Sequence, residues 1–151
     1  MKKKILILCI VVVAFILIFI IKSSIGTKPF KNLTTDEIKE VTVKLLPPDA
    51  TISLNKQDIS ELTVILNDVV IYNKDNSYKE YDGQVVIYTI VKTDGTQITV
   101  NACNPFLVID GVGYKTKYEP CEELNSLGNS IKNEYITTLF TLNYNFRVST
   151  F

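Results

Sequence analysis

The sequence predicts an α+β fold: an N-terminal transmembrane helix followed by one small domain with an antiparallel meander sheet and two to three helices on one face. Three observations support this. Residues 5–21 carry no charge and are flanked by lysines. Beyond them, short alternating runs separated by turn signals indicate successive strands, and two longer stretches show helical spacing of apolar residues. Because the strands come in runs without a regular β-α repeat, we expect an α+β domain.

The uncharged run at residues 5–21 is interpreted as a membrane anchor, with the core of a cleaved signal peptide as the alternative. As a helix it would extend about 25 Å, at the short end of the range that crosses a bilayer. Lys22 closes the run as in an anchor, whereas residues 24–26 match a signal cleavage site weakly. Cys9 lies inside the run and fits a lipid-attachment site poorly. We therefore expect residues 1–26 to be a cytoplasmic stub and transmembrane anchor.

The charged residues predict how the chain is oriented in the membrane, and they argue against nucleic acid as a partner. Lysines before the run favour a cytoplasmic N-terminus and an extracytoplasmic C-terminal domain in the cell membrane. Cleavage would instead give a secreted protein. From residue 28 onward the chain has 12 of its 16 basic residues and all 16 acidic ones, a net charge of −4. We expect no nucleic-acid partner, because such binding depends on basic surfaces.

The first part of the predicted domain, which spans residues 34–132, follows a linker at 27–33. A capping box at its start, Thr34 to Glu37, predicts a short helix. Two alternating runs come next and are separated by a proline turn, so we expect an antiparallel pair formed by residues 40–46 and 50–54.

Asn55 is expected to cap a helix over residues 56–68, whose apolar stripe is Ile59, Leu62, Ile65, Leu66 and Val69. Hairpin signals at Asp94-Gly95 and Asp110-Gly111 then predict a meander. Its strands are residues 84–92, 96–102, 106–109 and 113–117. A second helix begins near Glu119 and has one apolar face, formed by Cys121, Leu124, Leu127 and Ile131.

The last segment, residues 133–151, is expected to be a C-terminal tail or edge strand. Apolar and polar side chains alternate from residue 142 to residue 149, as in a strand. Three interpretations stay open: a strand that completes the sheet, a strand that docks on a partner, and a poorly ordered tail.

Catalytic and metal-binding patterns are missing from the sequence. His does not occur, which removes the commonest general base and metal ligand. No C-x-x-C pair is present, and the loop at residues 73–80 lacks the glycine and glutamate of a calcium loop. We expect no metal, no cofactor and no enzymatic activity.

Cys103 and Cys121 form an even pair in a domain expected to be exported. A disulfide between them would stabilise the fold by roughly 3 kcal/mol in the chain-entropy description. The alternative is two buried thiols, because Cys103 ends a predicted strand and Cys121 faces the predicted core.

A binding surface is predicted around residues 104–118, where tyrosines accumulate beside two glycines. Tyrosine is common at recognition surfaces because it buries a large area at low entropic cost, although strands favour it as well. The residues expected to form this surface are Asn104, Phe106, Asp110, Tyr114, Lys115 and Tyr118.

Two stretches carry a resemblance to a known family: LNDVVIYNKDNSYKEYDGQ at 66–84 and NPFLVIDGVGYKTKYEPCEELN at 104–125. The sequence over about 29–131 resembles an uncharacterised extracytoplasmic domain of Gram-positive bacteria. That domain occurs behind a single membrane anchor and appended to penicillin-sensing membrane metalloproteases. The resemblance implies no activity and no catalytic residue.

The leading functional hypothesis is a membrane-anchored extracytoplasmic module that binds or senses an envelope protein or a cell-wall component. One alternative is a small envelope hydrolase that uses the carboxylates of Asp82, Asp110 and Glu119. Retaining glycosidases need two such groups about 5 Å apart. The other alternative is a purely accessory structural domain.

Overall fold

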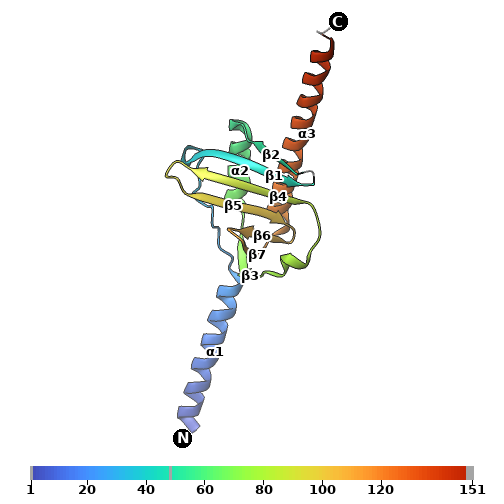
Figure 1. The fold of residues 1–151 in the computed structure, drawn as a ribbon. Coiled ribbons are helices and arrows are strands. Elements are labelled where there is room, and N and C mark those ends of the chain that lie inside the picture. Colours follow the sequence, from blue (N-terminus) through green and yellow to red (C-terminus); the bar gives the residue numbers. More distant parts are fainter. Residues whose placement is uncertain (1, 48, 149–151) are drawn as a thin grey trace.

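The structure, a computed structural model, describes residues 2–47 and 49–148, with side chains for 7–18, 25–47 and 49–141. Over these residues it is an α+β domain with a seven-stranded antiparallel sheet and three α-helices, which confirms the predicted class (Figure 1). The elements are α1 (Lys2–Ser24), the 3₁₀ helix η1 (Thr35–Glu37), β1 (Ile38–Leu46), β2 (Ala50–Ser53), α2 (Lys56–Asp68), β3 (Ile71–Lys74), the 3₁₀ helix η2 (Ser77–Glu80), β4 (Val85–Lys92), β5 (Gln97–Cys103), β6 (Phe106–Ile109), β7 (Val112–Thr116) and α3 (Tyr118–Val148).

The strands lie in the order β2-β1-β4-β5-β6-β7-β3, and every neighbouring pair is antiparallel. The predicted β1–β2 pair and the meander from β4 to β7 are both confirmed. Between β6 and β7, Asp110 and Gly111 have φ values of 48° and 80°. Left-handed backbone at both positions is what a two-residue Asp-Gly hairpin turn requires.

Strand β3 forms one edge of the sheet, although the pattern around residues 69–74 predicts no strand there. From this edge the chain returns to the interior strand β4, so residues 75–84 pass β7, β6 and β5 on the way. The Asp75 amide donates to the Gly113 carbonyl at 2.9 Å, and the Tyr78 hydroxyl donates to the Gly111 carbonyl at 3.3 Å. A Cβ at residue 113 would collide with the Asp75 carbonyl, so glycine permits this close crossing.

Helices α2 and α3 pack on one face of the sheet and enclose the core (Figure 1). The predicted stripe of α2 is buried at Leu62 and Leu66, and Asn55 caps this helix by accepting from the amides of Gln57 and Asp58. Alternate residues of the central strands face the helices, and each is at most 1% exposed: Val41, Val43, Leu45, Val86, Tyr88, Ile90, Val100 and Ala102. The predicted apolar face of α3 is buried as well: Cys121, Leu124, Leu127 and Ile131.

Helix α3 lies very close to the interior strand β4 at Gly128. A Cβ at residue 128 would lie 2.6 Å from Val86 Cγ1 and 3.2 Å from the Tyr88 hydroxyl. The same hydroxyl donates to the Leu124 carbonyl at 2.7 Å. Burial raises the pKa of Tyr88 well above its usual range, so the phenol stays protonated and keeps donating to the helix.

The segment 27–33, expected to be a linker, packs against the domain. Thr27 and Ile71 exchange two backbone hydrogen bonds of 2.8 Å. Phe30 and Leu33 are buried in the core cluster, and Asn67 Nδ2 donates to the Leu33 carbonyl at 3.1 Å. These contacts attach the chain to the sheet within a few residues of the end of α1.

Residues 133–151 are expected from the sequence to be a tail or an edge strand, and both strand interpretations are wrong over the part that the structure describes, because α3 continues to Val148. Once a helix has formed, each further residue adds a hydrogen bond at little cost. The hydroxyls of Thr137, Thr138 and Thr141 donate to carbonyls four residues earlier, so these polar side chains are satisfied along the helix. Residues 149–151 lie outside the described part of the chain.

Two helices project from the domain. Figure 1 shows α1 leaving beside β3, while the end of α3 extends from the opposite side of the sheet, so the outer ends of these two helices lie far apart. Among the described residues, no helix has both the length and the apolar character that a membrane span requires.

Gly128→Ala should destabilise the domain. Alanine favours helices over glycine by up to about 1 kcal/mol, but the added methyl group meets the stiff, buried Val86 side chain. We expect the free energy of unfolding to fall by about 1–3 kcal/mol, measured by chemical denaturation. Gly83→Ala is the control, because no atom lies within 4 Å of its Cβ position. A G128A variant as stable as the wild type would contradict the close contact between α3 and β4.

Candidate functional site

A hollow of about 270 Å³ lies where the crossing segment 75–84, the β5–β6 turn and the start of α3 meet. Three stretches of chain that are distant in sequence therefore contribute to it. Its lining residues are Tyr81, Asp82, Gly83, Gln84, Val85, Ala102, Cys103, Asn104, Tyr118, Glu122 and Asn125. We call it the α3 hollow.

Two tyrosines present their rings at the α3 hollow. Tyr81 and Tyr118 are 55% and 60% exposed, whereas Phe106 is 4% exposed. The rings of Tyr81 and Phe106 meet edge to face, with centroids 5.4 Å apart and planes at 60°. Phe106 is predicted from the sequence to form part of a binding surface, but it is buried and packs against the exposed Tyr81 ring.

Asn104 and Glu122 form the polar side of the α3 hollow. Asn104 Nδ2 donates to Glu122 Oε2 at 2.9 Å, which connects the β5–β6 turn to the first turn of α3. Because a carboxylate cannot donate, this bond also determines which end of the amide is the oxygen. Asn104 Oδ1 is buried and has no hydrogen-bond partner among the described residues.

Cys103 and Cys121 are free thiols in the structure. Cys103 is half-buried and lines the hollow, and burial raises its pKa. Cys121 is 1% exposed, and its thiol donates to the Phe106 carbonyl at 3.2 Å. Burial raises the pKa of Cys121 to about 12. The two thiols therefore differ in exposure, and Cys103 is the more reactive one.

The six residues of the predicted binding surface do not form one patch. Asn104 and Tyr118 line the α3 hollow. Tyr114 packs against the core on the helix side. Lys115 is exposed and pairs with Asp75, with 3.6 Å between Nζ and Oδ2.

Asp110, the remaining member of the predicted surface, lies at the opposite end of β6 from Asn104. It has a local structural role there, since its carboxylate accepts from the Thr99 amide at 2.8 Å and from the Thr99 hydroxyl at 3.1 Å. These bonds hold the β6–β7 turn against β5.

The three carboxylates of the hydrolase alternative do not all lie at one site, because Asp110 is remote from the other two. Asp82 lines the α3 hollow. Asp110 binds Thr99 at the far end of β6, and Glu119 is exposed in the first turn of α3 without being part of the lining. The described residues contain no group of three or more His, Cys, Asp or Glu side chains that could hold a metal ion.

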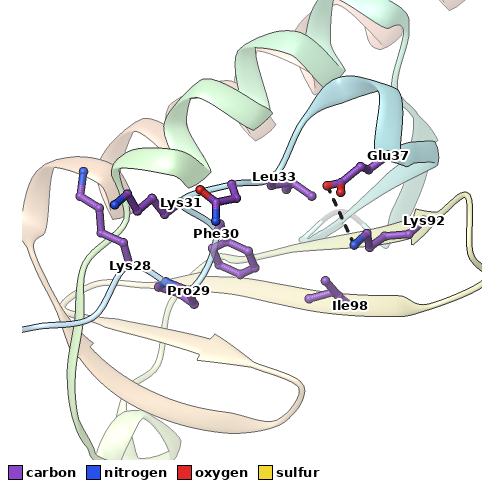
Figure 2. Close-up of a pocket in the computed structure, with 9 residues that line it drawn as sticks. Lys28, Pro29, Phe30, Lys31, Leu33, Glu37, Lys92 and Ile98 are labelled. Carbon is purple, nitrogen blue, oxygen red and sulfur yellow. Dashed lines mark ion pairs between the residues drawn. The ribbon is translucent and has the colours of Figure 1, made fainter.

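A second hollow of about 270 Å³ lies beside the segment that follows α1 (Figure 2). Lysines surround it, but acidic partners are close: Lys92 Nζ lies 4.0 Å from Glu37 Oε2, and Lys28 Nζ lies 3.1 Å from Asp68 Oδ1. Two of the three lysines in its lining are therefore paired with acids, and Lys31 is the third.

The sequence analysis missed two residues that matter most in the α3 hollow. Glu122 carries only the signal of an acidic first turn in a helix, and Tyr81 lies in a polar loop with no motif. No signal in the sequence indicates either residue, because both enter the hollow through contacts between segments that are distant along the chain.

Comparison with protein-family models, with curated proteins and with solved structures finds no match. The function is therefore inferred from the geometry of the chain itself.

The two outer cysteines should differ in their reaction with N-ethylmaleimide at pH 8. We expect Cys121 to be modified at least about tenfold more slowly than Cys103 in the native protein, because its thiol is buried and protonated. Peptide mass spectrometry over a time course measures both rates, and denaturant should equalise them. Equal native rates would contradict the burial of Cys121, and protection of both until a reductant is added would show a disulfide.

Proposed function

We propose that the chain is a membrane-anchored extracytoplasmic binding module of the cell envelope. Helix α1 holds it in the membrane, the N-terminus lies in the cytoplasm, and the α3 hollow is the binding site. The observation that carries the proposal is an apolar helix with no protein partner over its described side chains.

The side chains of residues 7–18 support the anchor. All of them are apolar and all are exposed, including Ile7 at 62%, Leu8 at 64% and Phe15 at 70%. Apolar side chains cover every side of the helix, whereas a helix that packs on a domain has one apolar stripe. An uncovered helix of this kind is stable in lipid, where its backbone hydrogen bonds are satisfied internally. The uncharged run extends over residues 5–21.

The outer location of the domain is supported by the three lysines that precede the run. Segment 27–33 then holds the domain directly against the end of α1. A domain attached in this way would present its surface close to the membrane.

A binding role is supported by the α3 hollow, which combines exposed aromatic rings with a few polar groups. Binding sites in proteins commonly have this composition. The described residues offer neither a metal cluster nor the three candidate carboxylates in one place, so nothing in the geometry favours hydrolysis over binding.

Membrane attachment should depend on the middle of α1. Each arginine placed near the centre of a spanning helix costs about 2.5–3.5 kcal/mol on insertion. We expect the wild-type chain to stay in the membrane fraction after an alkaline carbonate wash. The double variant Val12→Arg, Phe15→Arg should move to the soluble fraction, and Val12→Leu, Phe15→Leu is the matched control. Protease added to spheroplasts should digest the domain and spare an N-terminal tag. A wild-type chain in the soluble fraction would contradict the anchor.

Binding should be detectable at Tyr118 in intact cells. A photo-reactive benzoylphenylalanine at residue 118 would lie at the hollow, so we expect a discrete crosslinked product there. The same group at Gln97, which is exposed at the far end of β5, should give none. Gel shift and mass spectrometry identify the products. If both positions gave the same products, or residue 118 gave none, the hollow would not be the binding site.

A further inference from the structure

We propose that the α3 hollow binds a primary ammonium group, such as the side chain of a lysine in a peptide. The proposal rests on the proposed binding function and assigns the class of ligand to its site. Charge, aromatic rings and hydrogen-bonding groups each indicate this ligand.

The charge of the hollow is negative. Its lining includes the carboxylates of Asp82 and Glu122 and contains no lysine or arginine. One further carboxylate, Glu119, is exposed beside Tyr118 in the first turn of α3. Lys117 precedes the helix, and the helix start adds about half a positive charge. Three carboxylates outweigh these, so the site attracts cations.

The rings of Tyr81 and Tyr118 favour an organic cation over an uncharged ligand. A ring face attracts a cation that lies within about 6 Å of its centre. Both rings are more than half exposed and line the same hollow. The edge contact with the buried Phe106 holds Tyr81 in place before any ligand arrives, which reduces the entropy lost on binding.

The hydrogen-bonding groups favour a ligand that donates. Asn104 Nδ2 donates to Glu122, and Gln84 Nε2 donates to Asn129 Oδ1 at 3.0 Å, so both amides direct a donor toward the protein. Asn104 Oδ1 is left as a buried acceptor with no partner among the described residues. Such an acceptor costs free energy until a donor reaches it. A primary ammonium has three N–H donors, whereas a quaternary one has none.

Two further hollows lack this combination. The hollow of Figure 2 is lined by three lysines and one carboxylate, that of Glu37, so its charge does not favour a cation. The groove between α2 and α3 has Glu61 and Glu123 in its lining but no aromatic ring. Of these three hollows, the α3 hollow is therefore the one suited to an amine.

The test is a titration of the ¹⁵N-labelled full chain, in uncharged detergent micelles, with three forms of one small probe. The probes are Nα-acetyl-L-lysine methylamide, its Nε-trimethyl form and its Nε-acetyl form. We expect millimolar binding of the lysine probe, with shifts of the backbone amides of residues 81–85, 102–104 and 118–125. The trimethyl form should bind about fivefold more weakly because it cannot donate, and the neutral acetyl form should not bind.

Two glutamates one residue apart provide matched variants. Glu122→Gln removes a charge from the hollow, keeps an acceptor for Asn104, and should weaken the lysine probe about tenfold. Glu123→Gln makes the same change outside the lining and should alter binding by less than about twofold at moderate salt. Unchanged amide spectra in the absence of probe confirm that both variants are folded.

The outcomes separate this proposal from the proposed function. Equal shifts with the lysine and acetyl probes, or equal effects of the two glutamate substitutions, would overturn the ligand class. A crosslinked product at residue 118 without a response to the lysine probe would also overturn it, while the binding function stands. If the lysine probe bound as expected but the chain were found only in the soluble fraction, the membrane anchor alone would be overturned.

Discussion

The contact between α3 and the interior strand β4 is the interaction on which the rest of the structure depends. At Gly128 the helix lies so close to Val86 that no side chain fits between them. The Tyr88 hydroxyl reaches across this contact and donates to the Leu124 carbonyl. A buried polar group is stable only when it is hydrogen-bonded, so this bond restricts where the helix can sit on the sheet. The first turn of α3, with Tyr118 and Glu122, is positioned as a result.

The α3 hollow exists because of the route taken by the chain after β3. Since β3 lies at one edge and β4 in the middle of the sheet, residues 75–84 cross three strands before β4 begins. The crossing brings Tyr81 onto Phe106, beside the β5–β6 turn. The positioned start of α3 supplies the remaining wall. The hollow is thus formed by segments that connect the strands and helices, outside the packed core of the domain.

Of the six residues predicted to form a binding surface, Asn104 and Tyr118 line the hollow. The other four lie elsewhere because of strand geometry and strand order. Adjacent residues of a strand point to opposite faces of the sheet, so Tyr114 and Lys115 cannot share a surface. Which part of the sheet the crossing segment covers depends on the order of the strands. The spacing of apolar and polar residues along the sequence does not give this order. Phe106 is buried for this reason, and Tyr81 and Glu122 come to line the hollow through contacts between distant segments.

Local signals in the sequence were sufficient for the α+β class, the β1–β2 pair, the meander and its hairpin turns, and the cap and buried stripe of α2. Such features depend on hydrogen bonds and side-chain spacing within a few residues, so they can be read without the fold. Tertiary structure alone decided the edge position of β3, the packing of segment 27–33, the continuation of α3 to Val148 and the assembly of the hollow. Each of these depends on which distant segments come into contact. Such contacts are stabilised by the burial of apolar surface and by strand pairing between the segments, and neither can be read from one stretch of sequence.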